Sequence, residues 1–157
     1  MLTTRLDLTE FHRKVEASRS ALRQDIALAT RKAADTGVQA AKHGNFKDRT
    51  GQLRATIYTK STGWRSNVFW MLVHAPKEYA HFVDLGTKPH DIPTDHRPPG
   101  KPLHFYWEKR GVWFTGYRVH HPGTKPRMFF AAAIILMEER LQTELEKGFI
   151  NLRSVWH

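Results

Sequence analysis

The spacing of apolar residues predicts one long helix near the start of the chain, over about residues 8–43. Apolar and small residues recur there at intervals of three and four, which is the period of one helix face. That stripe consists of Phe11, Val15, Ser18, Leu22, Ile26, Ala29, Ala33, Thr36 and Ala40. Asp7 or Thr9 is expected to cap its start, and Gly44 to end it. Because such a helix spans roughly 50 Å, more than a small domain needs, we expect it to meet a partner.

The segments that follow predict strands. Leu53, Ala55 and Ile57 alternate with polar residues, as in a half-buried strand that continues to about residue 60. The nearly continuous apolar run 68–73 is typical of a central strand. In the short segment 77–85 we favour one or two helical turns.

A proline-rich stretch separates these elements from a predicted hairpin. Residues 88–102 hold five of the eight prolines and few apolar residues, which predicts a long loop or arm. Loops of this length in compact domains are usually functional or mobile, and we expect this one to contact neighbouring subunits. Residues 103–107 and 111–119 predict the two strands of the hairpin, with charged residues and Gly111 at its turn.

A second helix is predicted over about 128–147, with Gly148 at its end and a tail over 148–157. Its apolar face consists of Phe130, Ala133, Ile134, Met137, Leu141 and Leu145. The order of elements predicts a single α+β domain over residues 1–157, with a sheet and loop region at about 52–120. We expect one small, mostly antiparallel sheet of about four strands, with both helices packed on it.

One tetrapeptide occurs twice, as Gly86-Thr87-Lys88-Pro89 and as Gly123-Thr124-Lys125-Pro126. Glycine tolerates positive φ, and proline fixes its own φ and biases the residue before it toward extended backbone. We therefore expect a sharp, stiff exit from an element at both places, where a Cβ on the glycine would be destabilising. The alternative is a pair of ordinary turns that are alike by chance.

Charge is concentrated in the first two thirds of the chain. The formal net charge is +10, with twelve basic against six acidic residues in 1–60, and nine against five in 61–126. A strongly basic protein usually meets a polyanion or an acidic protein surface. The candidate contacts to DNA or to an acidic partner are Arg13, Lys14, Arg19, Arg23, Arg31 and Lys32. The alternative reading of these residues is a solvated helix face.

Composition limits the remaining classes. The chain has no cysteine, which excludes a disulfide scaffold and thiolate metal sites. Its start lacks an apolar stretch of signal-peptide length, and the apolar run 128–137 is shorter than the about 20 residues that span a bilayer. We expect a soluble protein with no membrane association.

Candidate chemistry is sparse, and we expect no enzymatic activity, no metal and no cofactor. His81 and Asp84 lie one helical turn apart, and further histidines and carboxylates fall in the proline-rich loop. His120 and His121 are adjacent, so in a strand they face opposite ways. A nuclease would need clustered carboxylates, for which only Asp84, Asp91 and Asp95 are candidates. Core and interface packing is the default role of Trp64, Trp70, Trp107 and Trp113, which could otherwise stack bases.

Three segments, 48–57, 79–87 and 121–133, occur in an order that resembles the tail-completion, or minor tail, family of tailed bacteriophages. The first matches an Arg-Thr-Gly-x-Leu-Arg motif at Arg49, Thr50, Gly51, Leu53 and Arg54. The second matches at Tyr79, Ala80, Val83, Gly86 and Thr87, with Asp84 where the family has Glu. The third contains Pro122, Gly123 and Thr124 and matches at Pro126, Phe129 and Ala132 or Ala133, with Arg127 and Met128 inserted.

This resemblance implies a structural protein of the virion neck, which assembles as a homo-oligomeric ring around the DNA path, with a hexamer as the first expectation. It further implies assembly in the host cytoplasm, contacts with connector, tail-terminator and tail-tube proteins, and non-specific proximity to packaged DNA. The alternative class is a small basic protein that binds nucleic acid or resembles a nuclease. A ring former should oligomerise without nucleic acid, whereas a nucleic-acid binder should show steep salt dependence.

Overall fold

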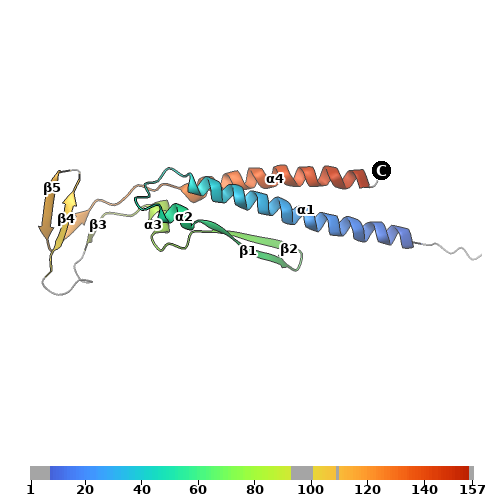
Figure 1. The fold of residues 1–157 in the computed structure, drawn as a ribbon, viewed down its shortest axis with the longest axis horizontal. Helices are drawn as coiled ribbons and strands as arrows, with labels where there is room; N and C mark the ends of the chain where they lie inside the picture. The colour runs from blue at the N-terminus through green and yellow to red at the C-terminus, as the bar shows by residue number, and fades with distance from the viewer. Residues whose placement is uncertain (1–7, 93–100, 109, 156–157) are drawn as a thin grey trace, which may run out of the picture. The chain divides into compact units, whose positions relative to one another are not determined.

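The computed structural model describes residues 8–92, 101–108 and 110–155 (Figure 1). The chain divides into two compact units, one formed by 1–78 with 128–157 and the other by 79–127, although the sequence suggested no boundary. We describe each unit by itself. The α+β class with a long N-terminal helix and a C-terminal helix is confirmed.

The first unit is built around two long antiparallel helices, α1 (Thr9–Lys42) and α4 (Phe129–Val155) (Figure 1). Small residues let them approach closely. A Cβ at Gly37 would overlap the Met137 side chain, and one at Gly44 would lie 2.6 Å from the Phe129 Cβ. Half of the buried apolar residues in the described parts of the chain are alanines: Ala27, Ala29, Ala33, Ala34, Ala41, Ala80 and Ala133.

The predicted limits of the first helix are confirmed, but its cap is not. Leu8 occupies the N-cap position without a side-chain hydrogen bond, and Thr9 is already helical. Asp7, the other expected cap, lies outside the described residues. At the other end the helix stops at Lys42, two residues before Gly44.

The predicted end of the second helix at Gly148 is wrong, because α4 continues to Val155. A Cβ at Gly148 would lie 3.1 Å from the Asp25 Cβ, so this glycine provides close helix packing instead of a stop. The predicted apolar face is only partly buried. Phe129 and Ala133 are buried, whereas Ile134 is half exposed.

The predicted strand at residues 53–57 is wrong as well, because α2 (Gln52–Thr56) is a short helix. Leu53 and Ile57 are both buried and Ala55 is exposed. Residues four apart share one side of a helix and also one side of a strand, so Leu53 and Ile57 fit both periods, whereas Ala55 fits the strand alone. Burial of only the first and last members identifies the helix.

The hairpin of β1 (Tyr58–Arg65) and β2 (Val68–His74) packs on α1. The Arg23 guanidinium lies 4.4 Å from the Trp64 ring centre, and that of Arg31 lies 5.7 Å from the Phe69 ring centre. The prediction of a central strand at 68–73 is wrong, because β1 is the single partner of β2 among the described strands. The side of β2 that carries Val68, Trp70 and Leu72 is exposed.

The second unit contains the short helix α3 (Ala80–Leu85), which confirms the helical turns predicted there. Four strands follow: β3 (His90–Ile92), β4 (Leu103–Trp107), β5 (Val112–Gly116) and β6 (Val119–His121). They pair antiparallel as β3–β6 and β4–β5. The predicted hairpin is confirmed, but its second strand ends at Gly116, and residue 119 belongs to β6.

The single sheet of about four strands is not formed. The described strands make three separate two-stranded sheets. Part of the predicted loop 88–102 is strand β3, and its residues 93–100 lie outside the described part of the chain. No helix in the described residues has the length and apolar character required to cross a membrane.

Candidate functional site

The two Gly-Thr-Lys-Pro segments lie side by side in the second unit and pair with each other. Thr87 and Thr124 form an antiparallel bridge in which each N–H donates to the other's carbonyl oxygen at 3.0 Å. Their hydroxyl oxygens lie 3.1 Å apart. The strands β3 and β6 continue this pairing, with His90 opposite His121. The repeated tetrapeptides are therefore partners in one structure, which we term the Gly-Thr clamp (residues 86–89 and 123–126).

Each glycine of the clamp fits under the backbone of the opposite segment. Gly86 has φ +74° and Gly123 has φ +83°, so the predicted left-handed backbone is confirmed. A Cβ on Gly86 would overlap the Thr124 carbonyl oxygen and lie 2.8 Å from the Pro126 nitrogen. A Cβ on Gly123 would overlap the Thr87 carbonyl oxygen. Only glycine satisfies both the backbone angle and the close approach.

The segment that begins at Tyr79 adjoins one end of the clamp. The Tyr79 carbonyl oxygen accepts hydrogen bonds from the Phe82 and Val83 N–H groups, at 3.1 and 3.2 Å, and starts α3. At the end of that helix the Arg127 N–H donates to the Asp84 carbonyl oxygen at 2.9 Å. The residues 79–87 and 122–127, far apart in sequence, are thus joined by backbone hydrogen bonds.

An acidic residue of β3 organises the other end of the clamp. The Asp91 carboxylate accepts from His120 at 2.9 Å and from the Arg118 guanidinium. Hydrogen bonds first from His120 and then from Arg118 lower the pKa of Asp91 below its ordinary value. His121 faces elsewhere, as predicted, and its Nδ1 accepts from the Gly123 N–H at 3.1 Å.

The histidine and carboxylate candidates do not converge. Within the described residues, no three metal-ligating side chains gather in one place. His81 lies against the Phe82 ring, with ring centres 3.8 Å apart and planes tilted by 42°. Asp95 lies outside the described residues, as does His96.

The Arg-Thr-Gly-x-Leu-Arg motif closes the end of α1 in the first unit. The Arg54 guanidinium donates to the carbonyl oxygens of Gly44 at 3.0 Å, Phe46 at 2.7 Å and Lys42. It also lies over the Phe46 ring, 4.2 Å from the ring centre. That ring packs against the Phe129 ring at the start of α4, with centres 4.6 Å apart. Arg54 therefore fixes the chain where both long helices meet.

The rest of this motif positions Arg54. The Asp48 carboxylate accepts from the Arg54 N–H at 2.8 Å, and the Gly51 carbonyl oxygen accepts from the Ala55 N–H at 3.0 Å. Leu53 is buried, whereas Arg49 and Thr50 are exposed. The bond to Asp48 was missed, because Asp48 lies three residues before the N-cap Gly51 and outside the usual capping position.

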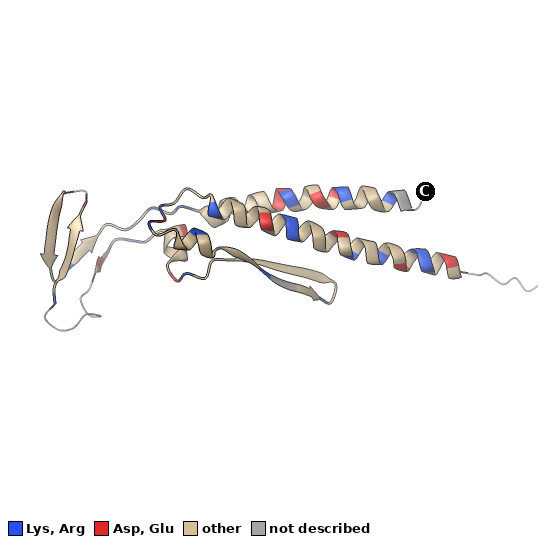
Figure 2. Cartoon of the chain, viewed as in Figure 1, with Lys and Arg blue, Asp and Glu red and all other residues tan. Residues whose placement is uncertain are grey.

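The six basic residues proposed to face DNA or an acidic partner all contact groups of their own chain. Arg13 and Lys14 pair with Glu10, and Arg19 pairs with Glu16, each at 3.8 Å. Arg23 and Arg31 lie over the aromatic rings of β1 and β2, and Lys32 bonds to Glu144 at 2.6 Å. Figure 2 shows acidic and basic residues interspersed along α1. The side chains of Arg13 and Arg19 stay mostly exposed despite these ion pairs, at 76% and 62%.

Sequence reasoning missed Glu144, which lies between the two long helices. Its side chain is only 5% exposed and contacts three cations: Lys32 at 2.6 Å, Lys147 at 2.8 Å and Arg140 at 3.2 Å. Hydrogen bonds from Lys147 and Lys32 lower the pKa of Glu144 from 4.5 to about 2. The sequence pattern of the helix does not distinguish Glu144 from its exposed charged residues. Only the packing of α1 shows that it is buried.

We predict that this ion cluster makes the stability of the protein depend on pH. Because the folded pKa of Glu144 lies below its ordinary value, its contribution is fully present above about pH 4.5 and is lost as the pH falls toward about 2. Thermal unfolding of Glu144→Gln should therefore show a weaker loss of stability over this range than the parent. Glu139→Gln, at an exposed position of the same helix, is the control and should follow the parent curve.

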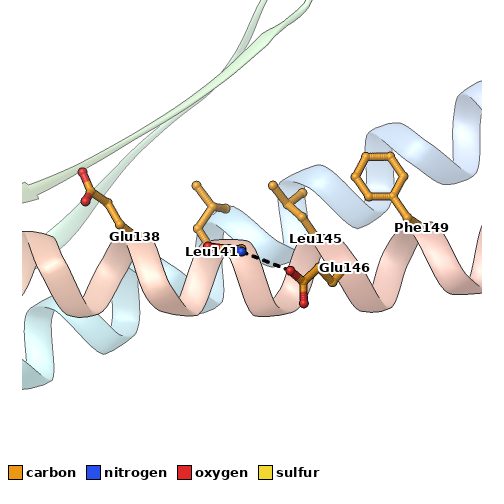
Figure 3. A pocket seen from close by; sticks show the side chains of 6 residues that line it. Glu138, Leu141, Leu145, Glu146 and Phe149 are labelled. Carbon is orange, nitrogen blue, oxygen red and sulfur yellow. Dashed lines mark hydrogen bonds between the residues drawn. The ribbon is translucent and has the colours of Figure 1, made fainter.

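A shallow pocket of about 370 Å³ follows one side of α4 (Figure 3). We term it the α4 groove. Its apolar part consists of Leu141, Leu145 and Phe149, and its other lining residues are Glu138, Gln142 and Glu146. Leu141 and Leu145, which were predicted on the apolar face of this helix, are half-buried and line this surface.

Comparisons of the chain with protein-family models, with curated proteins and with solved structures find no match.

Proposed function

We propose that this protein is a structural component of a tailed phage, which completes the tail or the head–tail joint as part of a ring around the DNA path. The observation that carries the proposal is the place of the three ordered motifs in the structure. In the first motif Arg54 bonds to the end of α1 and lies over Phe46, which packs against Phe129 of α4, and the other two motifs form the Gly-Thr clamp. The motifs that carry the resemblance thus hold the backbone in two places, at the end of α1 and in the Gly-Thr clamp.

Exposed apolar residues support a role in assembly. Phe11 and Val15 lie near the start of α1, Trp70 lies on the outer side of β2, and Ile150 lies near the end of α4. Large exposed apolar surfaces mark protein interaction sites. A subunit whose core is rich in alanine gains apolar burial when it assembles with copies of itself or with other neck proteins.

The test is deletion of the gene in a phage that carries it, followed by electron microscopy of the lysate. We expect DNA-filled heads and tails of normal length that fail to join, or particles that do not infect. Expression of the intact chain from a plasmid should restore infectivity. Joined, infectious virions from the deletion would contradict the proposal.

DNA-binding measurements on the purified protein distinguish this proposal from a nucleic-acid-binding function. Binding to duplex DNA should be weak, indifferent to sequence and lost as salt rises, because a channel through which DNA slides attracts phosphates without reading bases. Tight sequence-selective binding at physiological salt, or nuclease activity that depends on Asp84 or Asp91, would favour the alternative.

A further inference from the structure

A histidine of β6 closes the turn that leads from this strand into the Gly-Thr clamp. The Nδ1 atom of His121 lies 3.1 Å from the Gly123 nitrogen. A backbone N–H can only donate, so this Nδ1 is the acceptor and carries no proton. The neutral His121 ring therefore has its proton on Nε2. Pro122 stands between the two residues and fixes its own φ, which restricts the shapes that the turn can adopt.

The histidine opposite His121 has the reverse arrangement of its ring. His90 of β3 pairs with His121, and the two ring centres lie 5.1 Å apart. The Nδ1 of His90 lies 2.8 Å from the Lys88 carbonyl oxygen, which can only accept, so this Nδ1 carries the proton. His90 can therefore take a second proton on Nε2 and keep its bond. His121 can take one only on the nitrogen that accepts from the Gly123 N–H.

The acidic residue of β3 does not face this pair of rings. Asp91 lies opposite His120 in the β3–β6 register and accepts hydrogen bonds from His120 and Arg118. Neighbouring residues of a strand face opposite sides, so Asp91 lies on the other side of the two strands from His90 and His121. On the side of these two rings, a positive charge on one of them meets the other ring and not this carboxylate.

We infer that His121 is a pH-sensitive latch of the Gly-Thr clamp: its neutral ring holds the turn at Gly123, and protonation of the ring releases that turn. Protonation occupies the Nδ1 lone pair, so the Gly123 N–H loses its acceptor. The new charge also faces His90, and two protonated rings at this distance repel each other. The clamp segments add two exposed lysines, Lys88 and Lys125.

The latch gives the pH dependence of the clamp a definite sign. Histidine is the side chain that changes charge between about pH 5 and 8. The contribution of the His121 bond is therefore present at the upper end of this range and lost at the lower end. The inference does not depend on the phage function, because it concerns the fold of a single chain.

The adjacent His120 acts in the opposite direction. Its Nδ1 donates to the Asp91 carboxylate, and a bond of this kind becomes stronger when the ring gains a proton. Hydrogen bonds first from His120 and then from Arg118 hold the pKa of Asp91 below its ordinary value, so Asp91 keeps its charge over the same range. A loss of clamp pairing in mild acid therefore does not come from His120.

Nuclear magnetic resonance of the full chain tests the state of the ring and its effect. A long-range 1H–15N spectrum at about pH 8, where histidine is neutral, should show His121 with its proton on Nε2. Hydrogen exchange at the Thr87 and Thr124 amides, corrected for the intrinsic effect of pH, reports the pairing of the clamp. Its protection should fall about fivefold from about pH 8 to about pH 5, which corresponds to the loss of one ordinary hydrogen bond.

His121→Asn separates the latch from other effects of pH. The side-chain oxygen of asparagine accepts the N–H two residues further on, as in an Asx turn, and it does not titrate. This variant should have the protection of the parent at the higher pH and lose less than about twofold at the lower pH. His104→Asn, at an exposed histidine outside the clamp, is the matched control and should show the same loss as the parent.

Three outcomes would overturn the inference. One is a neutral His121 ring with its proton on Nδ1, because such a ring cannot accept from Gly123. Another is a parent clamp that is equally protected at both pH values. The third is an equal loss in the parent and in His121→Asn, since other groups would then cause it. The first two are measured on the parent, so they decide even if the variant fails to fold.

Discussion

Gly86→Ala and Gly123→Ala are each expected to lower the free energy of unfolding by about 3 kcal/mol. Two causes add at each position. The left-handed backbone costs a residue with a Cβ about 1–2 kcal/mol. The new methyl group also meets carbonyl and proline atoms of the opposite backbone, which cannot turn aside as a flexible side chain could. The expected result is loss of the pairing between Thr87 and Thr124.

Gly63→Ala separates these two causes. Gly63 has a similar φ of +78°, but a Cβ there would have nothing within 4 Å. We therefore expect only the backbone cost of about 1 kcal/mol. Urea denaturation measures the three variants, and hydrogen exchange at the Thr87 and Thr124 amides reports the clamp itself. Equal effects in all three would show that the close approach of the two segments contributes nothing.

The clamp also shows how far sequence reasoning reaches. The repeated tetrapeptide predicted two glycines with unusual backbone angles, and both have them. It did not predict that the two copies pair, because the partners are 37 residues apart and no local pattern carries that information. The long helix was predictable for the opposite reason, since its spacing of three and four repeats over many turns.

The errors at short elements have a common physical cause. Leu53 and Ile57 fit the helix and the strand period alike, and a segment of five residues is too short for the pattern to decide between them. Gly148 resembled a helix end, but the neighbouring Asp25 on α1 requires a small residue there. The apolar run of β2 indicated two covered sides, whereas this single chain covers only one. Each of these three structures is decided by what packs against the segment, which the local sequence does not show.

The exposed side of β2 and the α4 groove share one feature, namely apolar side chains that the described residues leave uncovered. The apolar run of β2 predicted a central strand and α4 was predicted to carry an apolar face, yet the described residues leave the side of β2 with Trp70 exposed and the α4 groove partly uncovered. Hydrophobic pattern identifies surfaces that are to be buried, but it does not say whether the same chain or another buries them. For an assembling protein, this kind of error points to candidate interfaces.

Arg54→Met is the second substitution with a large expected effect, and it should lower the free energy of unfolding by about 2–4 kcal/mol. The guanidinium bonds to the carbonyl oxygens of Lys42, Gly44 and Phe46, where α1 ends and the chain turns back. Methionine keeps much of the length of the side chain but donates no hydrogen bond. Thermal unfolding followed by circular dichroism measures the loss.

Two further variants assign the effect to the shape of the guanidinium. Arg54→Lys keeps the positive charge but offers one ammonium in place of a planar fork, so it cannot reach three carbonyl oxygens in different directions. We expect it to recover less than half of the loss. Lys47→Met removes a nearby exposed charge and should leave the unfolding temperature unchanged. If Arg54→Lys instead matched the parent, charge alone would stabilise the end of α1, and the requirement for arginine at this motif position would have to come from outside the folded subunit.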